Sequence, residues 1–200
     1  YKLILLFSFA SGCISSNVLD SSTSLSSKKS VIAIHSDELS YSEKEALIIL
    51  PGFGDSKKGR RHQKKYFKNV GYDLYIPDYI DRRSYAGTID RFTKLYNTYR
   101  LEEYKRVHIF SYILGSYVLN EFINESGKKN IKTIVYNRSP LQERAPRVVV
   151  ERIPLIGRIF AGKVLNEFSK VSYTPILNDE INIGMIVENK ATPLIRTFKK

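Results

Sequence analysis

Two short segments each join an apolar run of strand length to glycines, a combination that fits a binding or catalytic loop at the end of a strand. In the first, residues 48–56, Gly52 and Gly54 directly follow the apolar run. In the second, residues 107–116, an apolar run leads through small residues to Gly115. Glycine lets the backbone bend sharply and expose an N–H group at the turn. Both segments are therefore candidates for a binding or catalytic loop.

Serines and histidines near these segments are candidate catalytic residues, although each has a simpler interpretation. Ser111 and Ser116 flank the second turn, where a hydroxyl can act as a nucleophile but more often caps a helix or fits a crowded position. His108 lies inside an apolar run, which favours a hydrogen-bonded core histidine over a general base. His62 lies among basic residues, so we expect it to be solvated.

The elements that must position these residues alternate along the chain. Apolar runs of strand length occur at Val31–Ile34, Ala46–Leu50, Leu74–Ile76, Val107–Phe110, Ile131–Tyr136 and Ile183–Val187. Such short continuous runs fit strands buried on both faces of a parallel sheet. Residues 57–70, 88–99 and 116–124 have helical spacing. The alternation predicts an α/β fold, a mainly parallel sheet flanked by helices, with loops gathered at the carboxyl ends of the strands.

The order of these motifs resembles the α/β-hydrolase superfamily, and its bacterial lipase-like members in particular. Residues 50–54, Leu-Pro-Gly-Phe-Gly, stand where that family has its oxyanion loop. Further matching segments are 71–79, 137–140 and 183–194, so the resemblance covers about residues 45–197. It implies an α/β-hydrolase-like domain, and we expect that domain to lack the family's last strand and helix.

The nucleophile elbow of the family has the form G-x-S-x-G at a strand-to-helix turn. Aligned residue by residue, Ser111 and Gly115 take the flanking small positions and Ile113 takes the position of the nucleophile. The resemblance also implies that Phe53 and Leu114 offer the oxyanion N–H groups. Isoleucine has no nucleophilic atom, and a β-branched residue strains the positive-φ conformation of the elbow. We therefore expect a relaxed turn.

The residues of a complete catalytic triad cannot be assembled in the family's order. The family's acid and histidine follow the penultimate strand, whereas all three histidines here precede it and the sequence given ends at Lys200. We expect a non-catalytic lipase-like protein that binds an ester or acyl ligand. The alternative is an active esterase or lipase that uses Ser111 with an acid and a histidine beyond residue 200; a purely structural envelope role ranks third.

A further apolar stretch, about residues 146–172, takes the place of the insertion that covers the acyl-binding cleft of lipase-like folds. It carries apolar residues from Val149 to Phe168 with arginines among them. Helices that simply pack on the sheet would show the same pattern. The sequence alone leaves both interpretations open.

Charge and cysteine content limit the partners and cofactors. The 200 residues include 32 Lys and Arg against 20 Asp and Glu, which gives a net charge of +12 and suggests acidic partners. A single cysteine excludes an intramolecular disulfide and a multi-cysteine metal site; no metal or other cofactor is expected. The densest run of charge is a solvated helix face or a patch for anionic lipid headgroups, formed by Lys57, Lys58, Arg60, Arg61, Lys64 and Lys65. Nucleic acid is not expected, because no recognition motif is present.

The first thirty residues suggest targeting to a membrane. Lys2, an apolar run over residues 3–10 and the small residues 10–12 precede Cys13, an order that resembles the bacterial lipoprotein signal. The resemblance implies that Cys13 is the site of lipid attachment; an ordinary secretory signal or a buried cysteine is the alternative. Residues 14–30 are rich in serine and fit a flexible tether to the domain at 31–200. We expect a protein of the cell envelope, anchored on the non-cytoplasmic side.

Overall fold

The structure, a computed structural model, describes residues 32–36, 38–53, 56–127, 130–137, 162–177 and 180–187, together with positions 147, 150 and 151. Six strands form one sheet: β1 (Ile32–Ile34), β2 (Glu45–Leu50), β3 (Asp73–Ile76), β4 (Arg106–Tyr112), β5 (Ile131–Asn137) and β6 (Asn182–Ile186). Their order across the sheet is β1-β3-β2-β4-β5-β6. All six predicted strands are therefore present, each within a residue or two of its expected bounds.

Five strands, β2 to β6, run parallel, whereas β1 pairs antiparallel with β3. The first strand thus departs from the expectation of a parallel strand. Only residues 35–44 separate the end of β1 from the start of β2. A parallel arrangement needs a crossover of about a dozen residues or more, which this connection is too short to supply. The mainly parallel sheet flanked by helices is confirmed.

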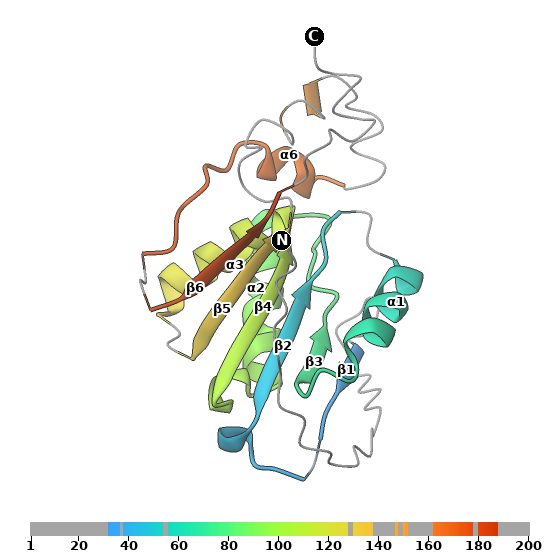
Figure 1. Cartoon of the computed structure of the whole chain (residues 1–200). Helices are drawn as coiled ribbons and strands as arrows, with labels where there is room; N and C mark the ends of the chain where they lie inside the picture. The colour runs from blue at the N-terminus through green and yellow to red at the C-terminus, as the bar shows by residue number, and fades with distance from the viewer. Residues whose placement is uncertain are drawn as a thin grey trace.

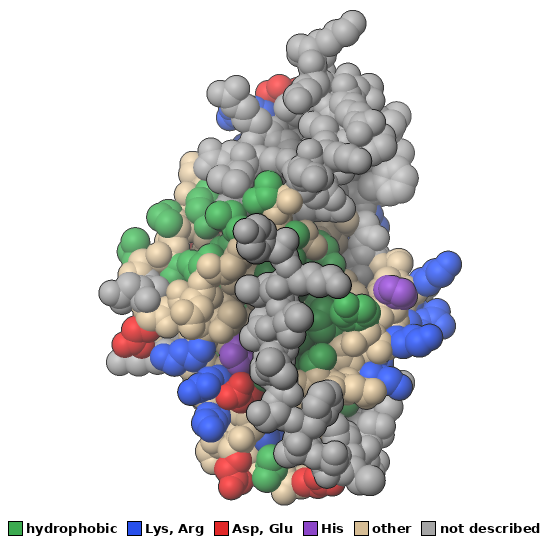
Figure 2. Space-filling model, viewed as in Figure 1, with side chains coloured by type: hydrophobic (Ala, Val, Ile, Leu, Met, Phe, Trp, Pro, Cys, Tyr) green, Lys and Arg blue, Asp and Glu red, His purple; other side chains and the backbone are tan. Residues whose placement is uncertain are grey.

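Helices cover both faces of the sheet (Figure 1). Helix α1 (Lys57–Phe67) lies on one face, and α2 (Tyr85–Thr98) and α3 (Ile113–Ser126) lie on the other. The short helix α6 (Val164–Phe168) lies beyond the carboxyl ends of the strands, and the 3₁₀ turns η1 (Tyr41–Glu43) and η2 (Leu101–Glu103) lie at their amino ends. The outer surface of α1 is rich in basic side chains (Figure 2).

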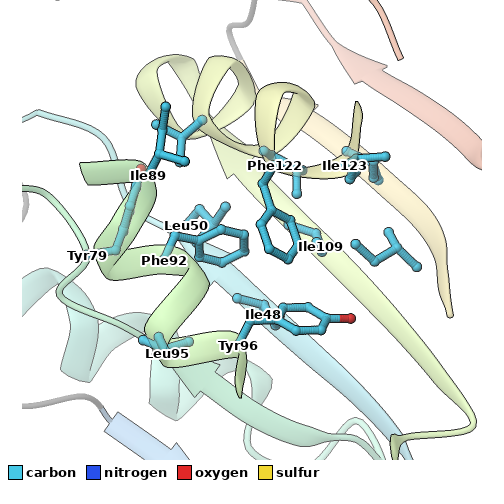
Figure 3. Packing of buried hydrophobic residues seen from close by; sticks show 14 of the residues in the cluster. Ile48, Leu50, Tyr79, Ile89, Phe92, Leu95, Tyr96, Ile109, Phe122 and Ile123 are labelled. Carbon is cyan, nitrogen blue, oxygen red and sulfur yellow. The ribbon is translucent and has the colours of Figure 1, made fainter. Parts of the chain in front are cut away.

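The main core fills the space between the sheet and the pair α2 and α3 (Figure 3). Phe92 of α2 and Phe122 of α3 meet edge to face with ring centroids 4.9 Å apart. Ile48 and Ile109 supply fully buried side chains from β2 and β4 beneath them. Each such side chain contributes about 1.5–3 kcal/mol through burial. This core holds the start of α3 against the end of β2.

Two helices begin three residues earlier than their spacing predicts. In α2, the Ser84 hydroxyl accepts a hydrogen bond from the Gly87 N–H at 3.2 Å, and this cap allows the helix to start at Tyr85. Helix α3 begins at Ile113, directly after the last residue of β4. No loop therefore separates β4 from α3, and the residue at the predicted nucleophile position opens the helix.

Candidate functional site

Three connections meet at the carboxyl edge of the sheet, where β2, β3 and β4 end. Leu50 pairs with Ser111 in the sheet register, so β2 and β4 end side by side. The Tyr79 hydroxyl, from the segment after β3, donates a 2.6 Å hydrogen bond to the Pro51 carbonyl. A Cβ placed on Gly52 would lie 3.3 Å from Tyr112 Cβ. The loop of Gly52 and the turn before Gly115 therefore lie at the same edge.

Gly115 occupies a crowded position at this edge. A Cβ at Gly115 would lie 2.6 Å from Ser111 Oγ, 2.9 Å from Leu50 Cβ and 2.9 Å from Tyr79 Oη. Glycine is thus required because the first turn of α3 passes directly over the end of β2 and beside the Tyr79 hydroxyl. This explains in physical terms why a small residue follows Ile113 at this spacing.

The turn that carries Ile113 has an ordinary backbone. Tyr112, its N-cap, has φ −93° and ψ 160°, and Ile113 begins the helix. Among the described residues other than glycine, Arg100 alone has a positive φ. The relaxed turn is what a β-branched residue requires, because positive φ is unfavourable for its side chain. Ile113 is half-buried and packs on the main core.

Ser111, the alternative nucleophile, is fully buried. Its hydroxyl lies 3.4 Å from both the Ser116 hydroxyl and the Tyr112 carbonyl oxygen. Neither group can accept the proton as a general base would. The hydroxyl instead fills the space beneath Gly115, which matches the interpretation of a small residue at a crowded position.

The three histidines lie away from this edge. His108 contacts the Glu45 carboxylate at 3.0 Å and precedes Ile113 by five residues of β4, about 16 Å along a strand. His35 lies 2.6 Å from the carboxylate of Asp73, the first residue of β3, at the opposite end of the sheet. His62 is exposed on α1, which lies on the opposite face of the sheet from α3. No histidine among the described residues is therefore placed to serve a nucleophile at position 113.

The two residues that the resemblance implies as oxyanion donors lie at the carboxyl edge. Leu114 is in the first turn of α3, where backbone N–H groups lack acceptors within the helix, and its side chain is fully buried. Phe53 is half-buried, and its ring centroid lies 6.0 Å from that of Phe168. Gly54, the third loop glycine of the prediction, falls outside the described residues.

Helix α6, the described helical part of the lid-like stretch, packs firmly on this edge. Phe168 meets Tyr117 edge to face at 4.7 Å and stacks on Tyr85 at 6.2 Å. The Glu167 carboxylate accepts a 2.7 Å hydrogen bond from the Tyr85 N–H at the start of α2. Ring contacts and this ion–dipole contact thus fix α6 over the loops that carry Phe53.

Tyr85 is buried in this aromatic cluster, and its hydroxyl has no hydrogen-bond partner within bonding distance among the described residues. Burial raises the pKa of Tyr85, and the nearby Glu121 carboxylate raises it further. A buried hydroxyl without a partner is unfavourable by about 1–3 kcal/mol. The Glu121 carboxylate beside it and a bound ligand are the two candidate acceptors for this hydroxyl.

Sequence reasoning missed the two tyrosines of this site. Tyr79 joins the Pro51 carbonyl to the crowded start of α3, and Tyr85 sits under α6. Tyr79 lies within a segment that carries the family resemblance, so its place after β3 was a usable signal. Nothing in the spacing of Tyr85 indicated a contact with Phe168, which lies 83 residues later.

Some predictions concern parts of the chain that the structure does not describe, including Cys13, the tether at 14–30 and most of residues 146–161. Within the described ranges, no helix has the length and apolar character needed to cross a membrane. The same ranges contain no group of three or more His, Cys, Asp or Glu side chains arranged to hold a metal ion.

Comparison with solved structures shows what this architecture is similar to. The AbyA5 structure aligns with a TM-score of 0.52 at 11% identity, over 80% of this chain and 58% of that one. The chain has an α/β-hydrolase-like fold, a mainly parallel sheet flanked by helices. MGS-M2, an α/β-hydrolase enzyme from a Medee basin deep-sea metagenome library, aligns at 0.46 with 14% identity, over 70% of this chain and 54% of that one.

A structure described with LipS and LipT, two metagenome-derived lipolytic enzymes, aligns with a TM-score of 0.43 at 11% identity, over 54% of this chain and 46% of that one. The chain spans about half the length of these structures. No protein-family model and no curated protein matches the sequence.

Proposed function

We propose that this chain is a non-catalytic lipase- or esterase-like protein that binds an ester or acyl ligand at the carboxyl edge of its sheet. The observation that carries the proposal is Ile113 at the turn from β4 into α3, in a relaxed backbone conformation. Covalent catalysis by this fold needs a nucleophilic atom at that turn.

The chemistry of the carboxyl edge suits a ligand with an apolar chain and a carbonyl. Phe53 and Ile113, both half-buried, supply apolar surface around the turn, and the buried Phe168 packs against Phe53. The N–H groups of Leu114 and Phe53 are the proposed donors to the ligand carbonyl, since the start of a helix favours negative charge. The Tyr85 hydroxyl is a third candidate donor, with the Glu121 carboxylate as its competing acceptor. An acyl group or ester would use all three features.

An active esterase that uses Ser111 is the competing proposal. It would require the Ser111 hydroxyl to leave its buried place beneath Gly115 and to reach both a base and the substrate. The burial of Ser111 and the pairing of His35 and His108 with Asp73 and Glu45 favour the binding protein.

Attachment to a membrane through acylated Cys13 completes the proposal. Its support is the sequence of the first thirty residues, which ends in small residues before the cysteine and continues as a serine-rich tether. Two or more acyl chains give stable retention, whereas one gives only marginal binding. Mass spectrometry of the native protein tests this point: an unmodified Cys13, or cleavage at another residue, contradicts it.

A binding experiment with a hydrolysable probe tests the ligand class. The full chain is titrated with a fluorescent medium-chain fatty-acid ester, and free acid is assayed in the same samples. We expect saturable binding without product. Tyr85→Phe removes one donor and should weaken binding about 5- to 10-fold, the value of one hydrogen bond. Tyr66→Phe, an exposed control on α1, should bind as the unchanged protein does. Absence of binding, or turnover of the probe, contradicts the proposal.

A further inference from the structure

Helix α1 and the residue that caps it present a dense cationic surface. The exposed basic residues are Lys57, Lys58, Arg61, Lys65 and Lys68, with Lys64 half-buried beside them. The sequence contains no Asp or Glu between residues 56 and 72, so no acid of this segment offsets their charge. Figure 2 shows a group of blue Lys and Arg side chains along the edge of the molecule where α1 lies. We call these six residues the α1 cationic face.

Arg60 is not part of this face, although its place in the sequence suggested that it belonged to the same patch. Its guanidinium is 2% exposed and contacts the Asp78 carboxylate at 3.0 Å. On the same inward side of α1, Phe67 packs against the second core cluster, which includes Ile49 and Leu74. A buried ion pair and a packed aromatic ring therefore fix the helix, and the remaining cations point away from the sheet.

Exposed apolar groups accompany the charges. Tyr66 is 76% exposed and Val70 is 45% exposed, both at the carboxyl end of α1. An aromatic ring among lysines is typical of surfaces that lie at the level of lipid headgroups, where the ring enters the interface and lysine stems extend along it. Tyr66 meets the ring of Phe67 edge to face at 5.1 Å, and most of its own surface is left exposed to solvent.

We infer that the α1 cationic face docks the domain on a bilayer that contains anionic phospholipids. Charge complementarity selects an anionic partner, and the exposed Tyr66 and Val70 favour a lipid interface over the hydrophilic phosphate backbone of nucleic acid. The inference uses the proposed attachment at Cys13 only to bring the domain near a bilayer. It adds a second, weaker contact that orients the domain on the membrane.

A vesicle experiment tests this contact without the lipid anchor. The full 200-residue chain with Cys13→Ser is sedimented with vesicles of phosphatidylcholine alone or with 30% phosphatidylglycerol. Each basic residue near an anionic surface strengthens binding about 5-fold. The triple variant Lys58→Gln, Arg61→Gln and Lys65→Gln should therefore bind the anionic vesicles on the order of 100-fold more weakly.

A matched control separates this surface from the overall charge of +12. Lys94→Gln, Lys105→Gln and Lys170→Gln make the same change of net charge at exposed residues on other elements. The control triple should keep most of the binding. Equal losses in both triples, no preference for anionic vesicles, or tighter binding to a DNA duplex than to vesicles would each overturn the inference. Because the fatty-acid ester assay does not use vesicles, these results are independent of the proposed ligand site.

Discussion

Gly115→Ala tests the packing that defines the carboxyl edge. The added methyl group would lie 2.6 Å from Ser111 Oγ and 2.9 Å from Leu50 Cβ and Tyr79 Oη. Contacts below 3.0 Å force a neighbour to move. Leu50 Cβ is fixed by the central strand β2, so rotation of a side chain cannot relieve all three contacts. Overpacking of this kind destabilises by about 1–3 kcal/mol.

For a chain of this length, each kcal/mol lowers Tm by about 2–4 °C, so the variant should melt about 2–12 °C lower. Urea denaturation measures the change in free energy of unfolding, and calorimetry measures Tm. Adding Ser111→Ala removes the shortest of the three contacts and should recover part of the loss.

Gly59→Ala, in the first turn of α1, is the matched control. Its methyl group would lie 3.4 Å from Ser56 Oγ, an ordinary contact. Replacing a helical glycine by alanine then stabilises by up to about 1 kcal/mol, so the two substitutions should have opposite signs. If the free energy of unfolding of Gly115→Ala lies within about 0.5 kcal/mol of the value for the unchanged protein, the three connections do not meet as described.

Three further predictions concern the turn, the buried ion pair and the buried tyrosines. Ile113→Ser should leave ester turnover at least about 10³-fold below that of an intact triad, because no histidine in the described ranges lies near the new hydroxyl; turnover like that of an ordinary lipase would contradict the placement of the histidines. Arg60→Ala removes the guanidinium 3.0 Å from the Asp78 carboxylate and should cost about 3–5 kcal/mol in urea denaturation, whereas a loss below about 1 kcal/mol would contradict the burial of this pair. Burial raises the pKa of Tyr75 and Tyr96 above about 10, the value in the unfolded chain. The folded protein therefore keeps its full stability from these neutral phenols below pH 10 and loses up to about 1.4 kcal/mol per pH unit for each residue above it. Absorbance at 295 nm should show these phenols ionising together with unfolding, and ionisation in the folded state would refute the assignment.

The alternation of strands and helices could be read from the sequence because it follows from burial. A strand that is covered on both faces must be apolar at consecutive positions, and the run Ala46–Leu50 shows this directly. The direction of β1 could not be read from its apolar run, because such a run looks the same in parallel and antiparallel pairing; the shortness of the connection over residues 35–44 was the signal that could have given it. The start of α2 was misplaced because the Ser84 cap contributes no apolar periodicity.

The candidate site was predictable only where local sequence decides the structure. The requirement for glycine at position 115 and the conflict of Ile113 with positive φ are local, and the sequence carries both. The contacts of Phe168 with Tyr85 and Tyr117 join residues far apart in the chain and depend on how α6 packs. For the same reason, sequence spacing grouped Arg60 with the exposed cations, whereas its tertiary partner Asp78 places it in the interior.

The absence of a catalytic nucleophile is the central claim, and covalent labelling tests it most directly. The full chain is treated with a fluorophosphonate probe that reacts with activated serines, digested, and analysed by mass spectrometry, with an active lipase as a positive control. We predict no labelled serine in the folded protein, because Ile113 has no reactive atom and Ser111 is buried with no general base in contact with it among the described residues. A stoichiometric adduct on Ser111, abolished by Ser111→Ala, would contradict it.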